Sequence, residues 1–371
     1  MNFEYTEEQR LLAESVRRFM ARDYGFEARR RIVASPGGAS DAVWSELASM
    51  GLLGLGIRAE YGGFGGGALD MMSVMEAIGE ALVVEPYLST VIGAQLIQRG
   101  GTPAQRERLL PGIAEGATRM AFAHTEADSR YDVARVSTRV RRDGDGLVVD
   151  GEKRVVIDGP HASTFAVTAR DDEGRFVVLL VDAKAAGLRR APMRMLDGHR
   201  GCDLILDQVR LPADALLGGP EDALVLAEEV VDFATALVCA EAVGAMRYAS
   251  DATLEYLKTR KQFGVPIGAF QALQHRMVDM VIECEQARSM ASLACARVDA
   301  GLPAAQRRRA VSMAKIKIAD ACRHVSQDAV QLHGGMGMTA ELKVSHTFRR
   351  LTAIAQQFGD ADFHLERCAR D

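Results

Sequence analysis

The residues with the clearest chemical potential lie in the run RKQFGVPIGAFQALQ, from Arg260 to Gln274. Arg260 and Lys261 carry positive charge, Phe263 is a large apolar group, and Gln271 offers an amide. Arginine suits phosphate oxygens because its donors form a planar fork. Taken alone, the same residues also fit an ordinary helical hairpin with a solvated Arg-Lys pair.

The flanking sequence predicts how these residues are held. A helical pattern leads in from about Glu221, and a second one leaves from Phe270. Between them the chain passes Gly264, Pro266 and Gly268. Glycines and a proline between two apolar-periodic runs predict a tight connection between antiparallel helices.

Two other segments are candidates for ligand contact. In AFAHTEADSRYD, a Thr-Glu pair ends a short apolar run, and the hydroxyl of Thr125 at a strand end suits hydrogen bonding to a polar ring system such as a flavin edge. An ordinary turn explains the same residues more simply. In QLHGGMGMT, from Gln331 to Thr339, three glycines follow a helical run. Glycines allow close approach of the backbone to a ligand and also end helices.

Composition excludes several classes of protein. The 371 residues, 48% hydrophobic and 26% charged, are those of a water-soluble globular chain. The net charge of -5 argues against general nucleic-acid binding. No apolar run approaches the roughly 20 residues that span a bilayer, and the acidic start MNFEYTEEQRLL is unlike a signal peptide. We therefore expect a cytoplasmic protein that neither binds nucleic acid nor enters a membrane.

The six cysteines show no CxxC and no paired spacing, so we expect neither a metal site nor a disulfide framework.

The periodicity of apolar residues divides the chain into three segments. Helical patterns fill residues 1–119, beginning with Thr6 as an N-cap. Short alternating runs separated by Asp-Gly pairs, among them Asp143-Gly144 and Asp150-Gly151, predict an antiparallel β domain over 120–219. Helical periodicity returns over 220–371 and predicts a four-helix bundle. The predicted class is α+β and mainly α.

These segments resemble the acyl-CoA dehydrogenase family over nearly the whole chain. The run EYLKTRKQFGVPIGAFQALQHRMVDM is similar to the hairpin with which one subunit of that family reaches the FAD of its neighbour. The matching positions are Arg260, Phe263, Gly264 and Gln271. The resemblance implies the family fold, FAD as cofactor, an acyl-CoA substrate and an electron-transfer flavoprotein as acceptor.

Two further FAD contacts are implied by the resemblance. The Thr-Glu segment of the family touches flavin and substrate, and Thr125 matches it. The glycine motif meets the adenosine-pyrophosphate end of FAD, and Gln331, Gly334 and Gly335 match it. His333 within the motif is expected to pack or to hydrogen-bond.

The sequence departs from the family at the flavin wall and in the Thr-Glu loop. Tyr131 replaces a serine that usually touches the cofactor, and Ala127 replaces a proline. The usual Trp-Ile-Thr that packs on the flavin is Val155-Val156-Ile157 here. The apolar wall is retained, and its hydroxyl contact is lost.

The largest departure concerns the catalytic base. Most family members carry a Glu before a Gly in the last helical region, and Phe358 occupies that position here. The alternative position on the first bundle helix is Ala234. Asp232 and Asp360 are weak candidates for a replacement, and both fit surface or capping carboxylates equally well.

Three explanations follow for the missing base. The chain is the base-lacking subunit of a heteromeric enzyme, or a nearby acid substitutes, or the fold serves another flavin reaction such as that of an oxidase or monooxygenase. The first is favoured because CAEAVGAMRYASDATLEYLKTRKQFG and QFGDADFHL are most similar to the small subunits of pimeloyl-CoA dehydrogenases. A homo-oligomer, or a heterotetramer with a Glu-bearing subunit, is therefore expected. A non-catalytic FAD-binding structural subunit is the alternative.

Overall fold

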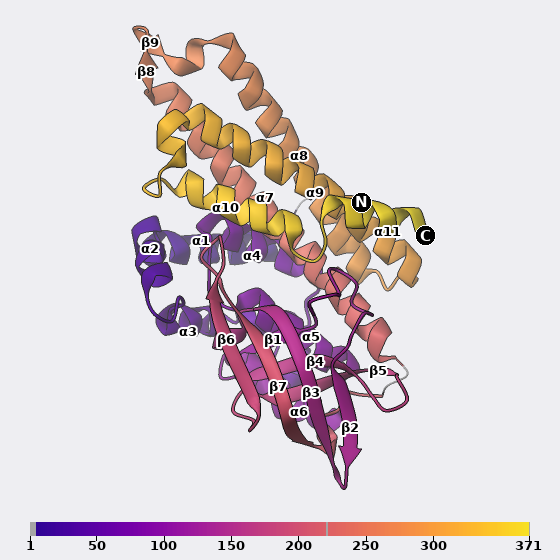
Figure 1. Ribbon diagram of the computed structural model, residues 1–371. Coiled ribbons are helices and arrows are strands. Elements are labelled where there is room, and N and C mark those ends of the chain that lie inside the picture. The colour runs from indigo at the N-terminus through magenta and orange to yellow at the C-terminus, as the bar shows by residue number, and fades with distance from the viewer. Residues whose placement is uncertain (1–4, 220–221, 371) are drawn as a thin grey trace. The chain divides into compact units, whose positions relative to one another are not determined.

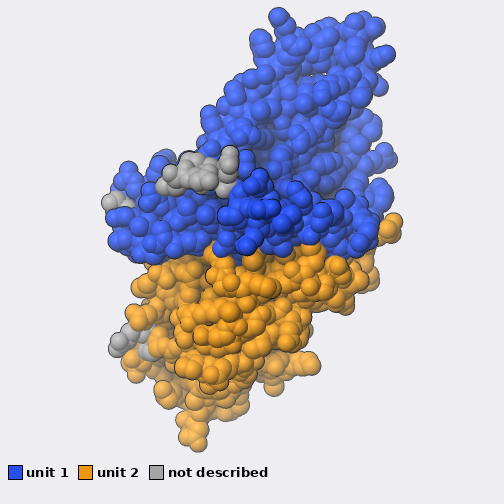
Figure 2. Space-filling view, turned by 180° about the vertical axis from the view of Figure 1, so that it is seen from behind, with its two compact units in different colours: residues 1–30, 68–83, 235–371 blue, residues 31–67, 84–234 orange. Residues whose placement is uncertain are grey.

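The computed structural model describes residues 5–219 and 222–370 and divides the chain into two compact units (Figures 1 and 2). One unit comprises residues 1–30, 68–83 and 235–371, and the other comprises residues 31–67 and 84–234. The predicted helix start at Glu221 lies outside the described residues, and the described helix α7 begins at Ala223.

The first unit is built from helices. They are α1 (Glu7–Asp23), the start of α2 (Phe26–Ala34), α4 (Ala68–Ala81), most of α7 (Ala223–Thr259), α8 (Gln271–Asp299), α9 (Ala304–His333), α10 (Lys343–Gln356) and α11 (Ala361–Arg370). Thr6 caps α1, as predicted, and closes a capping box with Gln9.

The predicted C-terminal bundle is confirmed. α8, α10 and α11 all pack on α9 (Figure 1). Cys295 on α8 contacts the carbonyl of Ala236 on α7. Helix α11 adds to the four helices that the sequence predicted. Helix α4 packs on α8 and so joins the N-terminal part of the chain to this bundle.

Two glycines allow α4 and α7 to cross in close contact. A Cβ on Gly79 would lie 1.9 Å from the Glu241 carbonyl oxygen, and a Cβ on Gly244 would lie 1.8 Å from that of Glu76. Only glycine fits at this distance. The crossing buries the carboxylate of Glu241, which Arg350 of α10 holds with two hydrogen bonds of 2.6 and 2.7 Å.

The second unit contains a seven-stranded sheet. Its strands are β1 (Met120–Ala123), β2 (Arg139–Asp143), β3 (Gly146–Ile157), β4 (Thr164–Arg170), β5 (Phe176–Asp182), β6 (Leu188–Arg194) and β7 (Arg200–Pro212). The order is β1-β4-β2-β3-β7-β6, with β5 beside β4. Most pairings are antiparallel, as predicted, but β1 and β2 both pair with β4 in parallel, so the sheet is mixed.

The helices of this unit are short. They are α3 (Asp41–Ser49), α5 (Tyr87–Gly100) and α6 (Pro103–Ala114), with the end of α2 and the start of α7. α5 packs on β1 and β4. A Cβ on Gly93 would lie 2.5 Å from the Met120 Cβ, so this glycine permits the close contact of helix and strand.

Two of the Asp-Gly pairs predicted as turns have different structures. Asp143 pairs with Gly146, and the two residues between them form the predicted hairpin turn of β2 and β3. Asp150-Gly151 is not a turn but lies inside β3, at a bulge where the pairing with β7 shifts register. Gly151 is needed there because a Cβ would lie 2.6 Å from Thr138 Oγ1.

No helix among the described residues has the length and hydropathy needed to cross a bilayer. The same residues contain no group of three or more His, Cys, Asp or Glu arranged to hold a metal ion.

Candidate active site

The hairpin between α7 and α8 presents its residues to solvent. Strands β8 (Lys261–Gln262) and β9 (Val265–Pro266) pair across a two-residue turn (Figure 1). Both turn residues, Phe263 (φ 53°) and Gly264 (φ 83°), have the positive φ of a type I′ turn. Phe263 is 92% exposed. A bulky aromatic held in this conformation in open solvent marks the tip as a contact surface.

Arg260 and Gln271 flank this tip and are exposed. The backbone of Arg260 is fixed, since its N–H donates to Tyr256 and its carbonyl accepts from Ile267. Within the described residues, no carboxylate lies within 4 Å of its guanidinium. Its charge is therefore available to a ligand.

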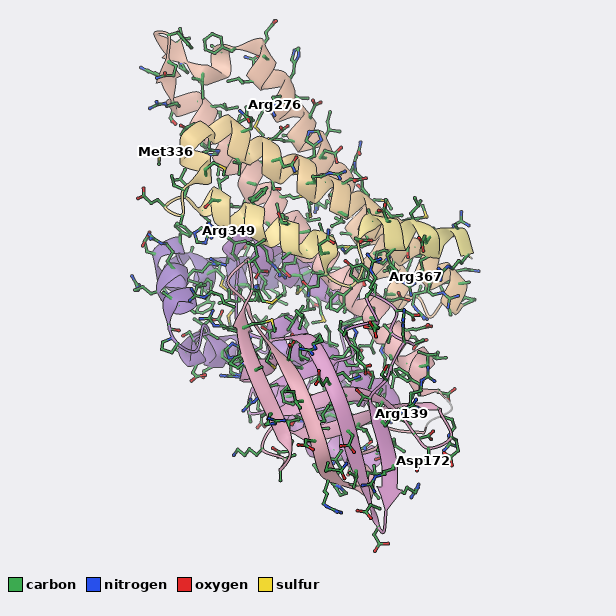
Figure 3. All side chains as sticks on the ribbon, viewed as in Figure 1. Arg139, Asp172, Arg276, Met336, Arg349 and Arg367 are labelled. Atoms are coloured by element: carbon green, nitrogen blue, oxygen red, sulfur yellow. The ribbon has the colours of Figure 1, made fainter. Side chains whose placement is uncertain are left out.

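Gln331, Gly334 and Gly335 lie at the end of α9, where the chain enters a 3₁₀ turn (Gly334–Met338). Met336 of this turn is labelled in Figure 3. A Cβ on Gly334 or Gly335 would meet no atom within 4 Å, so the backbone of both is open to an approaching group. Gln331 is exposed beside them.

A pair of stacked rings connects the end of α7 with the end of α9. The His333 ring lies 4.4 Å from that of Tyr256 on α7, nearly parallel to it. His333 is buried, its Nδ1 lies 2.8 Å from the Ala329 carbonyl, and burial lowers its pKa. It packs and hydrogen-bonds, as expected. The stack places the last turns of α7 and α9 at one end of the bundle.

Phe358 lies in the turn between α10 and α11 and is half-buried. It has φ 60°, and Gly359 after it has φ 121°. Lys315 of α9 donates to the carbonyl oxygens of Ile354, Ala355 and Gly359 at 2.8, 3.1 and 2.8 Å. The Lys315 ammonium thereby satisfies the carbonyls at the end of α10.

His364 supports the same turn. Its Nε2 lies 3.1 Å from the Phe358 carbonyl oxygen, and its Nδ1 lies 3.0 Å from Ser312 Oγ. A carbonyl only accepts, so we assign the proton to Nε2 and the role of acceptor to Nδ1. Burial lowers the pKa of His364 to about 3, with help from the charges of Lys315 and Arg367. The ring is therefore neutral.

This neutral histidine predicts acid sensitivity. The pKa of His364 is about 6.5 in the unfolded chain and about 3 in the folded chain, so the folded chain takes up this proton only at much lower pH. The unfolded state therefore binds more protons in this window, and stability falls as pH falls. We expect a loss on the order of 1 kcal/mol per pH unit below about pH 6 from this group.

Urea unfolding between pH 7 and pH 4 measures this loss. His364→Gln keeps an amide in place of the ring and should give a shallower pH dependence. Equal slopes in the two proteins would contradict the assignment. His124, whose pKa burial lowers to about 4, stays in both proteins and does not affect the difference.

Of the two acidic candidates near the usual base positions, one caps a helix and the other is buried. Asp360 accepts from the Phe363 N–H at 2.9 Å and so caps α11, one of the roles expected for it. Asp232 on α7 is fully buried, so its interpretation as a surface carboxylate was wrong. Its neighbours Phe233 and Ala234 are buried as well.

Thr125 belongs to the second unit and follows β1. Its carbonyl accepts from the Arg154 N–H of β3 at 2.8 Å. Its neighbour Glu126 is buried and accepts from Lys153 Nζ at 2.6 Å, from Thr138 Oγ1 at 2.7 Å and from the Ser137 N–H at 2.6 Å. The Glu126 carboxylate thereby fixes the loop that carries Thr125.

Burial and mutual attraction have opposite effects on the pKa values of Glu126 and Lys153. Burial raises the pKa of Glu126, but the hydrogen bond and charge of Lys153 outweigh it and the net shift is downward. Burial lowers the pKa of Lys153 to about 8 against the opposing effect of Glu126. We infer that the two groups form an ion pair at neutral pH.

Val155 forms the exposed part of the predicted apolar wall. It has φ 51°, which is rare for a β-branched residue. Asp203 of β7 holds this conformation, because its carboxylate accepts from the Val155 N–H at 2.9 Å and from Arg154 at 2.7 Å. The side chain of Val155 is 43% exposed. The strain is confined to one bulge of β3.

Sequence reasoning missed Lys153, Lys315, His364 and Asp203. Only Lys315 carried a signal. It lies on the apolar stripe of α9 formed with Val311, Ile318 and Cys322, at helical spacing. A lysine on a buried stripe predicts a charge held by polar partners.

Three domain models of one family match the chain in order. The acyl-CoA dehydrogenase N-terminal domain matches residues 6–117, the middle domain matches residues 121–209, and the C-terminal domain matches residues 224–371.

Curated relatives extend over most of the chain. Acyl-CoA dehydrogenase FadE12 of Mycobacterium tuberculosis is 34% identical over 373 residues, which cover 95% of this chain and 93% of the relative. Cyclohexane-1-carbonyl-CoA dehydrogenase of Geobacter metallireducens is 31% identical over 370 residues, which cover 95% and 94%.

Solved structures share the fold. A chain of the ChsE4-ChsE5 complex of Mycobacterium tuberculosis superposes with a TM-score of 0.91 at 26% identity, covering 100% of this chain and 98% of the other. A chain in the structure of the electron transferring flavoprotein of Acidaminococcus fermentans gives 0.91 at 26% identity, covering 100% and 99%. With its three domain models in order and relatives above 30% identity over nearly its full length, the chain belongs to the acyl-CoA dehydrogenase family.

Proposed function

We propose that this chain is a subunit of an FAD-dependent acyl-CoA dehydrogenase and lacks its own catalytic base. The observation that carries the proposal is Phe358. It stands where the base is expected, in a turn that Lys315 and His364 hold from two sides. The turn is held in place, and the side chain of Phe358 cannot accept a proton.

The exposed residues fit FAD. Arg260 offers a cation without a carboxylate partner among the described residues, which suits a phosphate oxygen. Gln271 and Gln331 offer exposed amides, and Gly334 and Gly335 leave backbone open to close approach. Thr125 and Phe263 complete the proposed set. When bound, FAD would take up the hydride that leaves the β-carbon of the acyl group.

The proton at the α-carbon needs a carboxylate from elsewhere. Asp360 is engaged as a helix cap, and Asp232 is buried within α7. A positioned base contributes about a hundred- to ten-thousandfold in rate. We therefore assign the base to a Glu-bearing partner subunit, in a heterotetramer or a related oligomer.

The surface of α8 supports association. Val278, Val281 and Ile282 are exposed at helical spacing and form an apolar stripe on α8. Among structurally similar proteins, ChsE4 and ChsE5 form a complex. We propose that the chain is of the same type as the small subunits of pimeloyl-CoA dehydrogenases and that an electron-transfer flavoprotein accepts its electrons. We propose domains over residues 1–119, 120–219 and 220–371.

An anaerobic titration with acyl-CoAs tests the assignment. Purified alone, the chain should bind FAD whose absorbance stays oxidised when a dicarboxylyl- or medium-chain acyl-CoA is added. Co-expressed with a Glu-bearing subunit, the complex should bleach. Full bleaching by the isolated chain would show that it has a base of its own and would overturn the proposal.

The capping role of Asp360 and the burial of Asp232 favour one alternative, a subunit that binds FAD for structural reasons alone. In that case the complex should bleach only the fraction of flavin that its Glu-bearing subunits hold. Rapid oxidation of reduced flavin by O₂ in the isolated chain would instead indicate an oxidase or monooxygenase.

Arg260→Ala should weaken FAD retention. The substitution removes a charge-assisted hydrogen bond of roughly 1.5–3 kcal/mol, or about tenfold or more in affinity. The ratio of flavin to protein after gel filtration measures it. Lys261→Ala removes the neighbouring exposed charge and should leave the ratio nearly unchanged. Equal losses in both variants, or none, would contradict a phosphate contact at Arg260.

A further inference from the structure

A cavity in the second unit is lined by none of the residues assigned to FAD. It has a volume of about 340 Å³ and is lined by residues of four segments. These are the loop before α3 (Pro36, Gly37), the turn after β3 (Pro160, His161), strand β6 (Pro192, Met193, Arg194) and the start of β7 (Arg200). β6 is the edge strand of the sheet (Figure 1).

Arginines surround this cavity and are anchored to backbone carbonyls. Arg194 and Arg200 both donate to the carbonyl oxygen of Val33, at 2.9 and 3.1 Å, and Arg200 also donates to that of Ser35 at 3.0 Å. Arg190 reaches the carbonyl oxygen of Pro160 at 3.4 Å. Among the described residues, none of the three arginines has a carboxylate within 4 Å.

Two buried nitrogen atoms at the cavity have no hydrogen-bond partner in the described part of the chain. They are Nη1 of Arg200 and Nε2 of His161. Arg200 is only 8% exposed, so its free donor is costly unless a ligand accepts from it. The fold makes room for this side chain at Gly38, where a Cβ would lie 2.3 Å from Arg200 Nε.

The two guanidinium groups also repel each other. They converge on one carbonyl oxygen, and besides burial, the charge of Arg194 lowers the pKa of Arg200. Burial lowers the pKa of His161, and the charge of the neighbouring Asp158 opposes this effect. Ser89 donates to Asp158 at 2.6 Å, and Asp41 pairs with Arg119. An anion placed between the arginines would relieve the repulsion and accept a hydrogen bond from Nη1 of Arg200.

We propose that this cavity binds the oxyanion of a small phosphorylated or carboxylated molecule. Arg194 and Arg200 would hold the oxyanion, since planar guanidinium donors match phosphate and carboxylate oxygens. The volume is that of a small-molecule pocket rather than of a single ion. Arg190 would add charge at the rim.

Titration with inorganic phosphate at constant ionic strength, followed by calorimetry, tests the site in the full chain. We expect saturable binding at one site and a rise in melting temperature that follows the occupancy. Arg194→Gln removes an exposed guanidinium and should weaken binding about tenfold, the effect of one charged hydrogen bond.

Arg189→Gln is the matched control. It removes the same charge from the same strand, at a position that does not line the cavity, and should change the affinity less than twofold. Equal weakening in the two variants would mean diffuse attraction by a basic surface. That result, or the absence of saturable binding by the wild-type chain, would overturn the proposal.

A second titration distinguishes the source of the oxyanion. If coenzyme A displaces phosphate, and Arg194→Gln weakens it by the same factor, the site takes a phosphate of the coenzyme. If coenzyme A leaves phosphate bound, the site takes a separate molecule. Either outcome supports the site and assigns its ligand.

Discussion

A Phe358→Glu variant of the isolated chain should gain acyl-CoA-dependent bleaching of its flavin. The expected gain is a factor on the order of 100 to 10,000, the contribution of a positioned general base. The turn should accept the new side chain, because Phe358 already has φ 60° and its strain arises at a Cβ that Glu shares. Lys315 and His364 hold the carbonyls of Gly359 and Phe358, whatever side chain residue 358 carries.

Anaerobic stopped-flow absorbance at the flavin band measures this gain. Phe358→Gln is the matched control, since it has nearly the same shape as Glu and no ionisable group. A gain in the Gln variant would point to relief of crowding instead of proton transfer. No gain with Glu, in a chain that retains FAD, would contradict a turn already arranged for a base.

The order of helices, sheet and bundle could be predicted because its signals are local. Thr6 and Gln9 are three residues apart and form the cap by themselves. The glycines of the hairpin tip likewise need only their neighbours, so the tight connection at Phe263-Gly264 followed from composition. Such signals survive in a sequence without knowledge of tertiary contacts.

The buried polar groups of the candidate site could not be predicted, because their partners are distant in sequence. Lys315 contacts Gly359, 44 residues away, and Lys153 contacts Glu126, 27 residues away. Periodicity places a lysine on a buried face but does not identify which oxygen it meets. The same holds for Asp203, whose contact with Val155 creates a strained bulge that no local pattern indicates.

The same cause explains one wrong prediction and two glycines inside helices. Asp150-Gly151 has the composition of a turn, yet pairing with β7 keeps it inside a strand. Gly79 and Gly244 are small residues inside helical patterns, where glycine is unfavourable. Glycine is required at both positions because α4 and α7 cross there, and this crossing exists only in the folded chain. Tertiary contact overrides local preference at all of these positions.

Lys153→Met should lower the free energy of unfolding by about 3–5 kcal/mol, because it leaves the buried Glu126 carboxylate without its counter-charge. Lys153 is fully buried and Glu126 is 8% exposed, so water cannot replace the lost ammonium without opening the sheet. Thr168 Oγ1 also loses its donor, now 2.8 Å from Lys153 Nζ. Urea unfolding at pH 7 measures the loss.

The double variant Glu126→Gln with Lys153→Met separates charge from packing. It removes both charges, and the single Gln oxygen can still accept from the Thr138 N–H, while the amide nitrogen replaces the oxygen that accepts from the Ser137 N–H. If the uncompensated charge causes the loss, the double variant should be more stable than Lys153→Met alone. If the double variant is instead the less stable of the two, the lysine contributes chiefly through the packing of its aliphatic stem. The loop that carries Thr125 would then owe its position to strand packing and not to the ion pair.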